Sequence, residues 1–89
     1  MQKTVVVLSD DRRWKRDTES WLASYAVPLV ARGLADVALV RASNPWNVRK
    51  LVNRAHRAAR AVILVGEDLE WPCSIVRVLD AIKRARRAA

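Results

Sequence analysis

A ten-residue pattern occurs three times in the chain, and it constrains the fold more than any other feature. The copies are VVVLSDDRRW (5–14), VALVRASNPW (37–46) and VILVGEDLEW (62–71), each with an aliphatic run, a polar turn and a tryptophan in the tenth place. Short aliphatic runs rich in valine are typical of strands buried on both faces, as in a parallel sheet. The repeat therefore predicts three strands, each leading into a helix.

Helix signals follow each polar turn. An aspartate at position 10 or 11 can cap the first helix, and Pro28 interrupts this helix towards its end. A polar cap followed by proline predicts a second helix over residues 45–59. Asp68 predicts the cap of a third helix that continues to about residue 86. Strands and helices thus alternate along the whole chain.

This alternation predicts a three-layer α/β domain built from three βα units. Connections this short imply right-handed crossovers between parallel strands. With one helix on the opposite face, the simplest strand order is 2-1-3, which leaves the second and third strands at the edges. A chain of 89 residues is long enough for one domain, so we expect residues 1–89 to form a single unit.

Several classes of site are excluded by composition. Cys73 is the only cysteine and His56 the only histidine, which excludes an internal disulfide and a zinc site of the usual spacing. With only two glycines, the chain holds neither a phosphate-binding loop nor a dinucleotide fingerprint. No apolar run approaches the length of a membrane span. We expect a cytoplasmic protein that uses no cofactor and no membrane.

The polar turns predict where a local site would lie. In open α/β sheets ligands bind beyond the carboxyl ends of the strands, where helix N-termini also point. Asp10, Asp11 and Asp68 fall at these ends and could hold a ligand or a divalent metal, as in a receiver-like domain. The alternative is that these carboxylates only cap helices.

Charge gives a second candidate surface. The chain has 17 Lys and Arg against 9 Asp and Glu, a net charge of +8, which attracts nucleic acid and other polyanions. Lys50, Arg54 and Arg57 share one face of the second predicted helix, opposite its apolar side. The candidate polyanion-binding residues are Arg49, Lys50, Arg54, Arg57, Arg84 and Arg87. The alternatives are a merely solvated helix face and an arginine content set by a GC-rich coding sequence.

The repeated tryptophans have two interpretations. Trp14, Trp46 and Trp71 would each lie in the first turn of a helix, where an indole can pack the helix start against the strand end. The same residues could instead form an aromatic rim around a partner. The third predicted helix carries more apolar positions than one stripe needs, Val78 among them, so we also count it as a candidate interface with another subunit.

The residues SDDRRW (9–14) after the first strand, and ARAVILVGEDLEWPC (59–73) around the third, resemble the first three βα units of a TIR-like domain of flavodoxin-like fold. The resemblance covers nearly all of the chain, but the last two strands of that family are missing. The family's Trp-Cys pair matches Trp71 and Cys73 with Pro72 inserted. The positions matching the catalytic glutamate of NAD-cleaving members are Ile75 or Val76. The resemblance therefore implies an interaction module and not an NADase.

Together these observations favour a small basic, non-catalytic interaction module that forms homo-oligomers or binds a protein partner. Two alternatives remain open at this stage. One is a nucleic-acid-binding protein that uses the second helix and the C-terminal arginines. The other is a metal-dependent or receiver-like site at the carboxyl ends of the strands.

Overall fold

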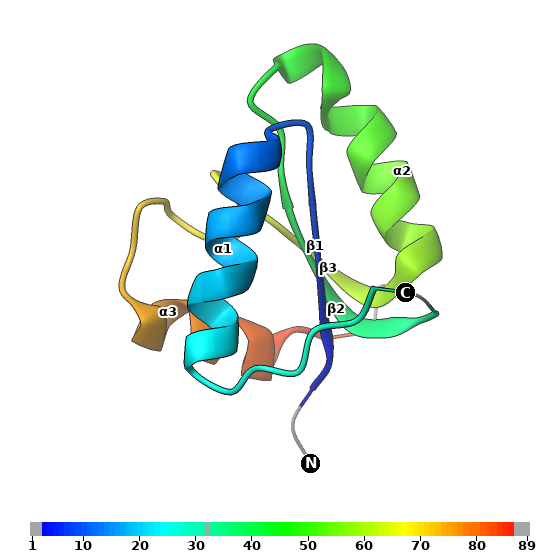
Figure 1. Cartoon of the computed structure of the whole chain (residues 1–89). Coiled ribbons are helices and arrows are strands. Elements are labelled where there is room, and N and C mark those ends of the chain that lie inside the picture. Colours follow the sequence, from blue (N-terminus) through cyan, green and yellow to red (C-terminus); the bar gives the residue numbers. More distant parts are fainter. Residues whose placement is uncertain (1–2, 32, 87–89) are drawn as a thin grey trace.

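A computed structural model of the chain describes residues 3–31 and 33–86. Its elements follow one another in the order β1 (Val5–Ser9), α1 (Arg12–Ser24), β2 (Ala35–Arg41), the 3-10 helix η1 (Pro45–Asn47), α2 (Val48–Ala58), β3 (Ala59–Leu64) and α3 (Ile75–Arg84). Figure 1 shows the strands side by side between the helices. The predicted alternation of strands and helices is confirmed.

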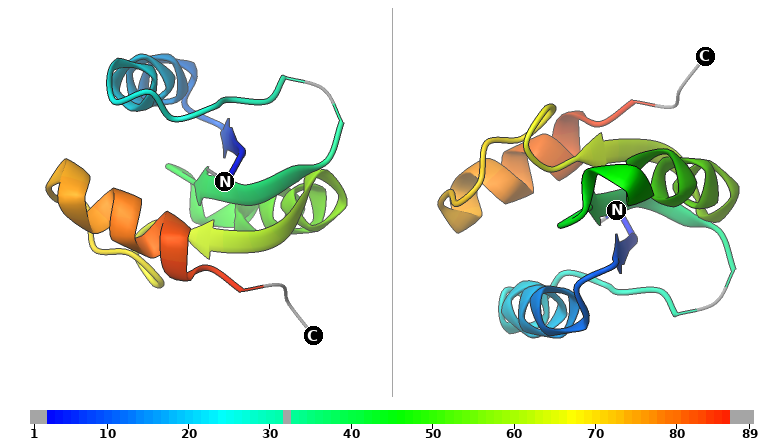
Figure 2. Two further views of the ribbon diagram at one scale, coloured as in Figure 1. Left: turned by 90° about the horizontal axis from the view of Figure 1, so that it is seen from below. Right: turned by 90° about the horizontal axis from the view of Figure 1, so that it is seen from above.

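The sheet has three parallel strands in three layers with the helices, as predicted. Side chains alternate between its faces because successive residues of a strand point in opposite directions. Val5, Val7 and Leu39 face α1 and α3, whereas Leu8 and Val40 face α2. The end-on views in Figure 2 show α1 and α3 on one side of the sheet and α2 on the other.

The predicted strand order of 2-1-3 is wrong. The observed order is β1-β2-β3, with β2 in the centre and β1 and β3 on either side of it. The reason lies in the segment after α1. Residues 28–30 pair with the outer side of β1: the N–H of Val5 donates to the carbonyl of Pro28 (2.9 Å), and the N–H of Val30 donates to the carbonyl of Val5 (2.9 Å). The position beside β1 that the second strand was expected to fill is thus taken by this short segment.

The chain reaches this position through a tight turn after α1. Ala26 adopts the left-handed conformation (φ 59°), and the N–H of Val27 bonds to the carbonyl of Leu22. Pro28 then enters an extended segment, where its fixed φ and missing N–H are tolerated. The predicted break in the first helix is confirmed, although the helix already ends at Ser24.

The first two helices begin close to the predicted positions. Asp11 caps α1, and its side chain accepts from the N–H groups of Arg13 and Trp14. The predicted second helix, residues 45–59, is the 3-10 turn η1 followed by α2, which ends at Ala58. Asn44 caps η1 and accepts from the N–H of Trp46, while proline occupies the first position.

The third helix begins later than predicted. Ser74 caps α3, and residues 66–73 form a loop instead of its first turns. Asp68 contacts the end of β3, where its carboxylate accepts from the N–H of Leu64 (2.8 Å). Gly66 lies in the left-handed region (φ 101°) and its N–H bonds to the carbonyl of Leu69, which closes a tight turn and buries the Leu69 side chain in the core.

Candidate functional site

The carboxyl ends of β1 and β2 are the natural place for a ligand, because these adjacent strands lead into helices on opposite faces of the sheet. Here the structure brings together two of the polar turns, residues 9–11 and 41–44. The third polar turn, residues 66–68, follows β3 and is separated from the first by β2.

Asp10 links these two turns. Its Oδ1 accepts from the backbone N–H and the hydroxyl of Ser43 (2.8 and 3.0 Å), and its Oδ2 accepts from the N–H of Asn44 (3.0 Å) and the Nδ2 of Asn47 (2.9 Å). These bonds, that of Asn47 above all, hold the pKa of Asp10 well below its ordinary value. A carboxylate offers about four acceptor positions, so none is left for a metal ion.

Asp11 is equally engaged. Its Oδ1 caps the first turn of α1, with bonds of 3.0 and 3.1 Å to the N–H groups of Arg13 and Trp14, while its Oδ2 lies 3.6 Å from the Nη1 of Arg41. The guanidinium of Arg41 also lies over the ring of Trp14, 5.5 Å from its centroid. The carboxylates at the ends of β1 and β2 are therefore engaged in contacts within the chain.

The three aspartates proposed as a ligand or metal site do not meet. Asp68 binds the outer edge of β3, on the far side of β2 from Asp10 and Asp11. No group of three or more His, Cys, Asp or Glu side chains is placed to hold a metal within residues 3–31 and 33–86. Asp11 caps α1 and Asp68 closes the turn after β3, in agreement with the alternative interpretation, whereas Asp10 binds the distant turn that leads into η1.

The repeated tryptophans have different environments. Trp71 packs edge-on against both Trp14 (ring centroids 5.5 Å apart) and Trp21 (5.8 Å), and these three indoles border the core below α1 and α3. The indole N–H of Trp14 is buried without a hydrogen-bond partner in the described structure. Trp46 instead projects from η1 with 89% of its surface exposed. The expected structural role therefore fits Trp14 and Trp71, and it is wrong for Trp46.

The predicted interface residue on α3 does not face outwards. Val78 is completely buried beneath the helix, in the same cluster as Leu22 and Ile82. The neighbouring Val76 is the exposed residue, with 70% of its surface accessible. The exposed apolar residue of α3 is therefore Val76, which lies on the side of the helix opposite to Val78.

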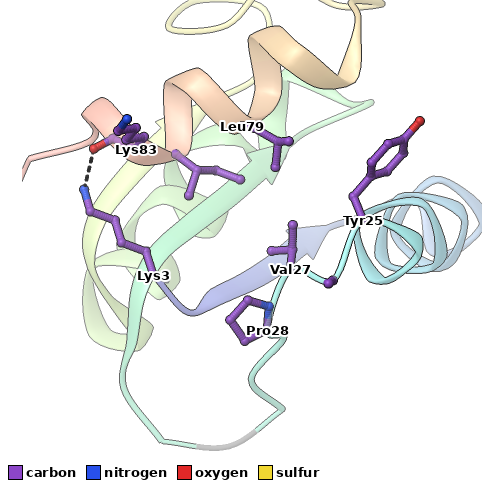
Figure 3. Close-up of a pocket in the computed structure, with 8 residues that line it drawn as sticks. Lys3, Tyr25, Val27, Pro28, Leu79 and Lys83 are labelled. Atoms are coloured by element: carbon purple, nitrogen blue, oxygen red, sulfur yellow. Dashed lines mark hydrogen bonds between the residues drawn. The ribbon is translucent and has the colours of Figure 1, made fainter. Parts of the chain in front are cut away.

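A groove that the sequence did not reveal runs between the end of α1 and α3. Figure 3 shows Tyr25, Val27 and Pro28 on one side and Leu79 on the other. The groove has a volume of about 320 Å³. Lys3 crosses one end, where its Nζ donates to the carbonyls of Lys83 (2.9 Å) and Ala85 (2.7 Å) and thereby satisfies the last turn of α3. Residues 25–28 and 79–83 are too far apart in sequence for any local pattern to connect them.

The predicted polyanion-binding residues fall into two groups. Four of them, namely Arg49, Lys50, Arg54 and Arg57, are exposed on α2. Arg84 is exposed on α3 and pairs with Asp80 (3.2 Å). Arg87 lies outside the described residues. The structure thus brings the α2 group together and separates it from Arg84.

The two remaining titratable candidates are not paired for catalysis. His56 is exposed in the last turn of α2, whereas Cys73 is half-buried before α3, and burial raises the pKa of its thiol. A raised pKa lowers the fraction of reactive thiolate at neutral pH.

No family model, no curated protein and no solved structure matches the chain. Among the helices that the structure describes, none has the length and apolar character needed to cross a bilayer.

Proposed function

We propose that the chain is a small non-catalytic α/β interaction module that associates with a second copy of itself through the outer surface of α3 and the groove beside it. The proposal rests on one observation above all: Tyr25, which lines the apolar groove, is 50% exposed, and Val76, one turn before the groove residue Leu79 on α3, is 70% exposed. Large apolar side chains gathered in this way mark interaction surfaces more often than they mark sites of chemistry.

The charges of α3 favour a second copy over an unrelated partner. Val76, Asp80 and Lys83 lie on neighbouring turns of its exposed side, so an acid and a base flank the exposed valine. The other two bases of the helix, Arg77 and Arg84, pair with Glu70 and Asp80 of the same chain. Two such helices packed antiparallel can place the acid of one opposite the base of the other, with the valine and leucine between them. This two-fold arrangement is the commonest in homo-oligomers.

Two further considerations support an interaction module. At the strand ends, where an α/β enzyme would bind its substrate, the carboxylate of Asp10 is engaged in bonds within the chain. Residues 28–30 can be counted as a short second strand, so that β2 and β3 become the third and fourth strands. The order is then 2-1-3-4, which matches the doubly wound order of flavodoxin-like folds. A flavodoxin-like fold and kinship with TIR-like interaction domains are part of the proposal.

Size-exclusion chromatography coupled to light scattering tests the proposal. We expect a dimer whose population rises with protein concentration, and a monomer for Val76→Glu, which places a charge in the apolar contact. Leu34→Glu is the matched control, because Leu34 is also exposed (56%) but lies just before β2, away from α3. A strict monomer at high concentration, or a dimer unchanged by Val76→Glu, would contradict self-association.

A further inference from the structure

The outer surface of α2 carries cations and no acidic residue. The chain contains no acidic residue between Asp36 and Glu67, a stretch that includes all of η1, α2 and β3. Along α2 the exposed cations Lys50, Arg54 and Arg57 follow one another at intervals of four and three residues. These intervals place them in one stripe, while Leu51 and Ala55 on the opposite side are buried against the sheet.

None of the cations of α2 takes part in an ion pair, and no acidic residue lies on the helix itself. The four ion pairs of the described residues join Lys15 to Glu19, Arg41 to Asp11, Arg77 to Glu70, and Arg84 to Asp80. All of them lie on α1, α3 or the ends of the strands. A row of cations without neighbouring acids keeps a strong positive potential, and it binds the phosphates of a polyanion by releasing counterions.

Trp46 lies in η1, the turn that leads into α2, four residues before Lys50. Its ring is 89% exposed, which leaves a large apolar surface in water. The backbone beneath it is held firmly: its own N–H bonds to Asn44 (3.0 Å), and Asp10 binds Asn44 and Asn47 on either side. The indole is therefore presented on a fixed turn and needs little ordering before it can stack on a ligand.

We propose that Trp46, Lys50, Arg54 and Arg57 form a binding surface for single-stranded nucleic acid. The cations lie along α2, which at 11 residues is about 16 Å long, and they contact successive phosphates. An unpaired base stacks on the Trp46 ring. Exposed aromatic rings combined with a cationic track are the usual means by which proteins bind single strands without reading their sequence.

The aromatic ring favours a single strand over the two other anionic surfaces. In a duplex the faces of the bases are already stacked, so the indole would find a partner only at an end. An anionic membrane would require several apolar side chains on the outside of α2, but those of Leu51 and Ala55 are buried. Duplex DNA and vesicles therefore serve as competing outcomes of the test.

Fluorescence anisotropy with labelled oligodeoxythymidine and oligouridine of about 12 nucleotides provides the test. We expect binding that weakens steeply from about 50 to about 200 mM salt, with a slope of roughly −2 in log–log form if three phosphates are neutralised. Trp46→Ala should weaken binding by about 5- to 150-fold, the effect of losing one stacked base. The combined variant Lys50→Glu, Arg54→Glu and Arg57→Glu should abolish it.

A matched control uses three exposed cations of α1, with Arg12→Glu, Arg13→Glu and Arg16→Glu combined, because it changes the net charge equally. This variant should retain most of the binding. All the substituted side chains of α2 are exposed, and a thermal unfolding profile like that of the unmodified protein will show that each variant is folded. The oligonucleotide should quench the tryptophan emission of the unmodified chain. It should not quench the emission of Trp46→Phe, since the other three tryptophans lie away from α2.

Four results would overturn the proposal: equal losses for the two triple variants, unchanged affinity in Trp46→Ala, tighter binding to duplex than to single strands, or binding to anionic vesicles but not to nucleic acid. Val76→Glu separates this proposal from the proposed self-association. That variant should still bind the oligonucleotide even where it is monomeric.

Discussion

The two faces of the sheet are covered in different ways. On one face α1 and α3 share a core of large side chains, including Val5, Leu22 and Leu39, bordered by three tryptophans. On the other face α2 alone packs against the sheet, and alanines such as Ala38, Ala55 and Ala59 form much of the contact. Small residues allow a helix to lie close to the strands, so a single short helix suffices to cover that side.

This difference extends to the outer surfaces. On the face with the bulky side chains, α1 and α3 are separated by the groove between Tyr25 and Leu79. The single helix packs on alanines, and its outer side carries the cations Lys50, Arg54 and Arg57. The groove beside α3 and the cations of α2 therefore lie on opposite faces of the sheet.

The largest effect is expected for Leu22→Ala. Leu22 is completely buried between α1 and the sheet, so truncation removes apolar contacts and leaves a cavity that the surrounding large side chains cannot fill. The free energy of unfolding should fall by about 2 to 5 kcal/mol, measured by urea denaturation. Leu34→Ala is the control, since Leu34 is mostly exposed. A loss below about 1 kcal/mol for Leu22→Ala would show that the α1 and α3 face is loosely packed.

The reverse substitution probes the α2 face. Ala55 has no exposed surface and lies against β2 and β3, so Ala55→Leu adds three carbons where there is no room. We expect a loss of about 1 to 3 kcal/mol in the same denaturation experiment. Ala23→Leu, at an exposed position of α1, is the matched control. If Ala55→Leu is tolerated like Ala23→Leu, then the alanines do not hold α2 close to the sheet.

The elements themselves could be predicted from the sequence, because their signals are local. Valine runs predict the strands, and Asp11 and Asn44 fall at their caps within one residue of the expected positions. The start of α3 could not be predicted, since Asp68 and Ser74 are both good caps. Only the folded chain shows that the carboxylate of Asp68 binds the Leu64 N–H and that Ser74 is the cap.

The strand order and the surfaces depended on contacts between distant residues. The strand order follows from two backbone hydrogen bonds between Val5 and residues 28–30, which no local sequence pattern predicts. The repeat suggested that its three tryptophans were equivalent, but only Trp14 and Trp71 meet, because only they lie on the face shared by α1 and α3. The cationic stripe of α2 could be predicted, because it depends on helical spacing alone.

Asp10 joins the two sides of the sheet, because it follows β1 and binds the turn that leads into α2. Asp10→Asn replaces one acceptor oxygen by a donor, which must then face the donors of Ser43, Asn44 or Asn47. We expect a loss of about 1 kcal/mol in the free energy of unfolding at pH 7, a modest value because the site is exposed. Asp17→Asn, at an exposed position of α1, is the control.

The same variant should alter the response to acid. The hydrogen bonds lower the pKa of Asp10 in the folded chain, so its contribution to stability is complete above the ordinary carboxyl pKa of 3.8 and is lost as the pH falls below it. Asp10→Asn should therefore show a shallower loss of stability below about pH 4. Part of the acid dependence should remain, because bonds from Thr4 lower the pKa of Asp36 as well. An unchanged acid profile would contradict the role given to Asp10.

The smallest effect concerns Cys73, whose half-buried thiol packs against the α1 and α3 core. Because burial raises the pKa of this thiol, its alkylation by iodoacetamide at pH 8 should be slower than that of the unfolded chain. Leu22→Ala, which loosens the same face, should accelerate the reaction, whereas Ala55→Leu should leave it nearly unchanged under conditions where both variants remain folded. If both substitutions accelerate the alkylation of Cys73 equally, the two faces of the sheet open together as one cooperative unit. The different packing of the two faces would then have no separate effect on local stability.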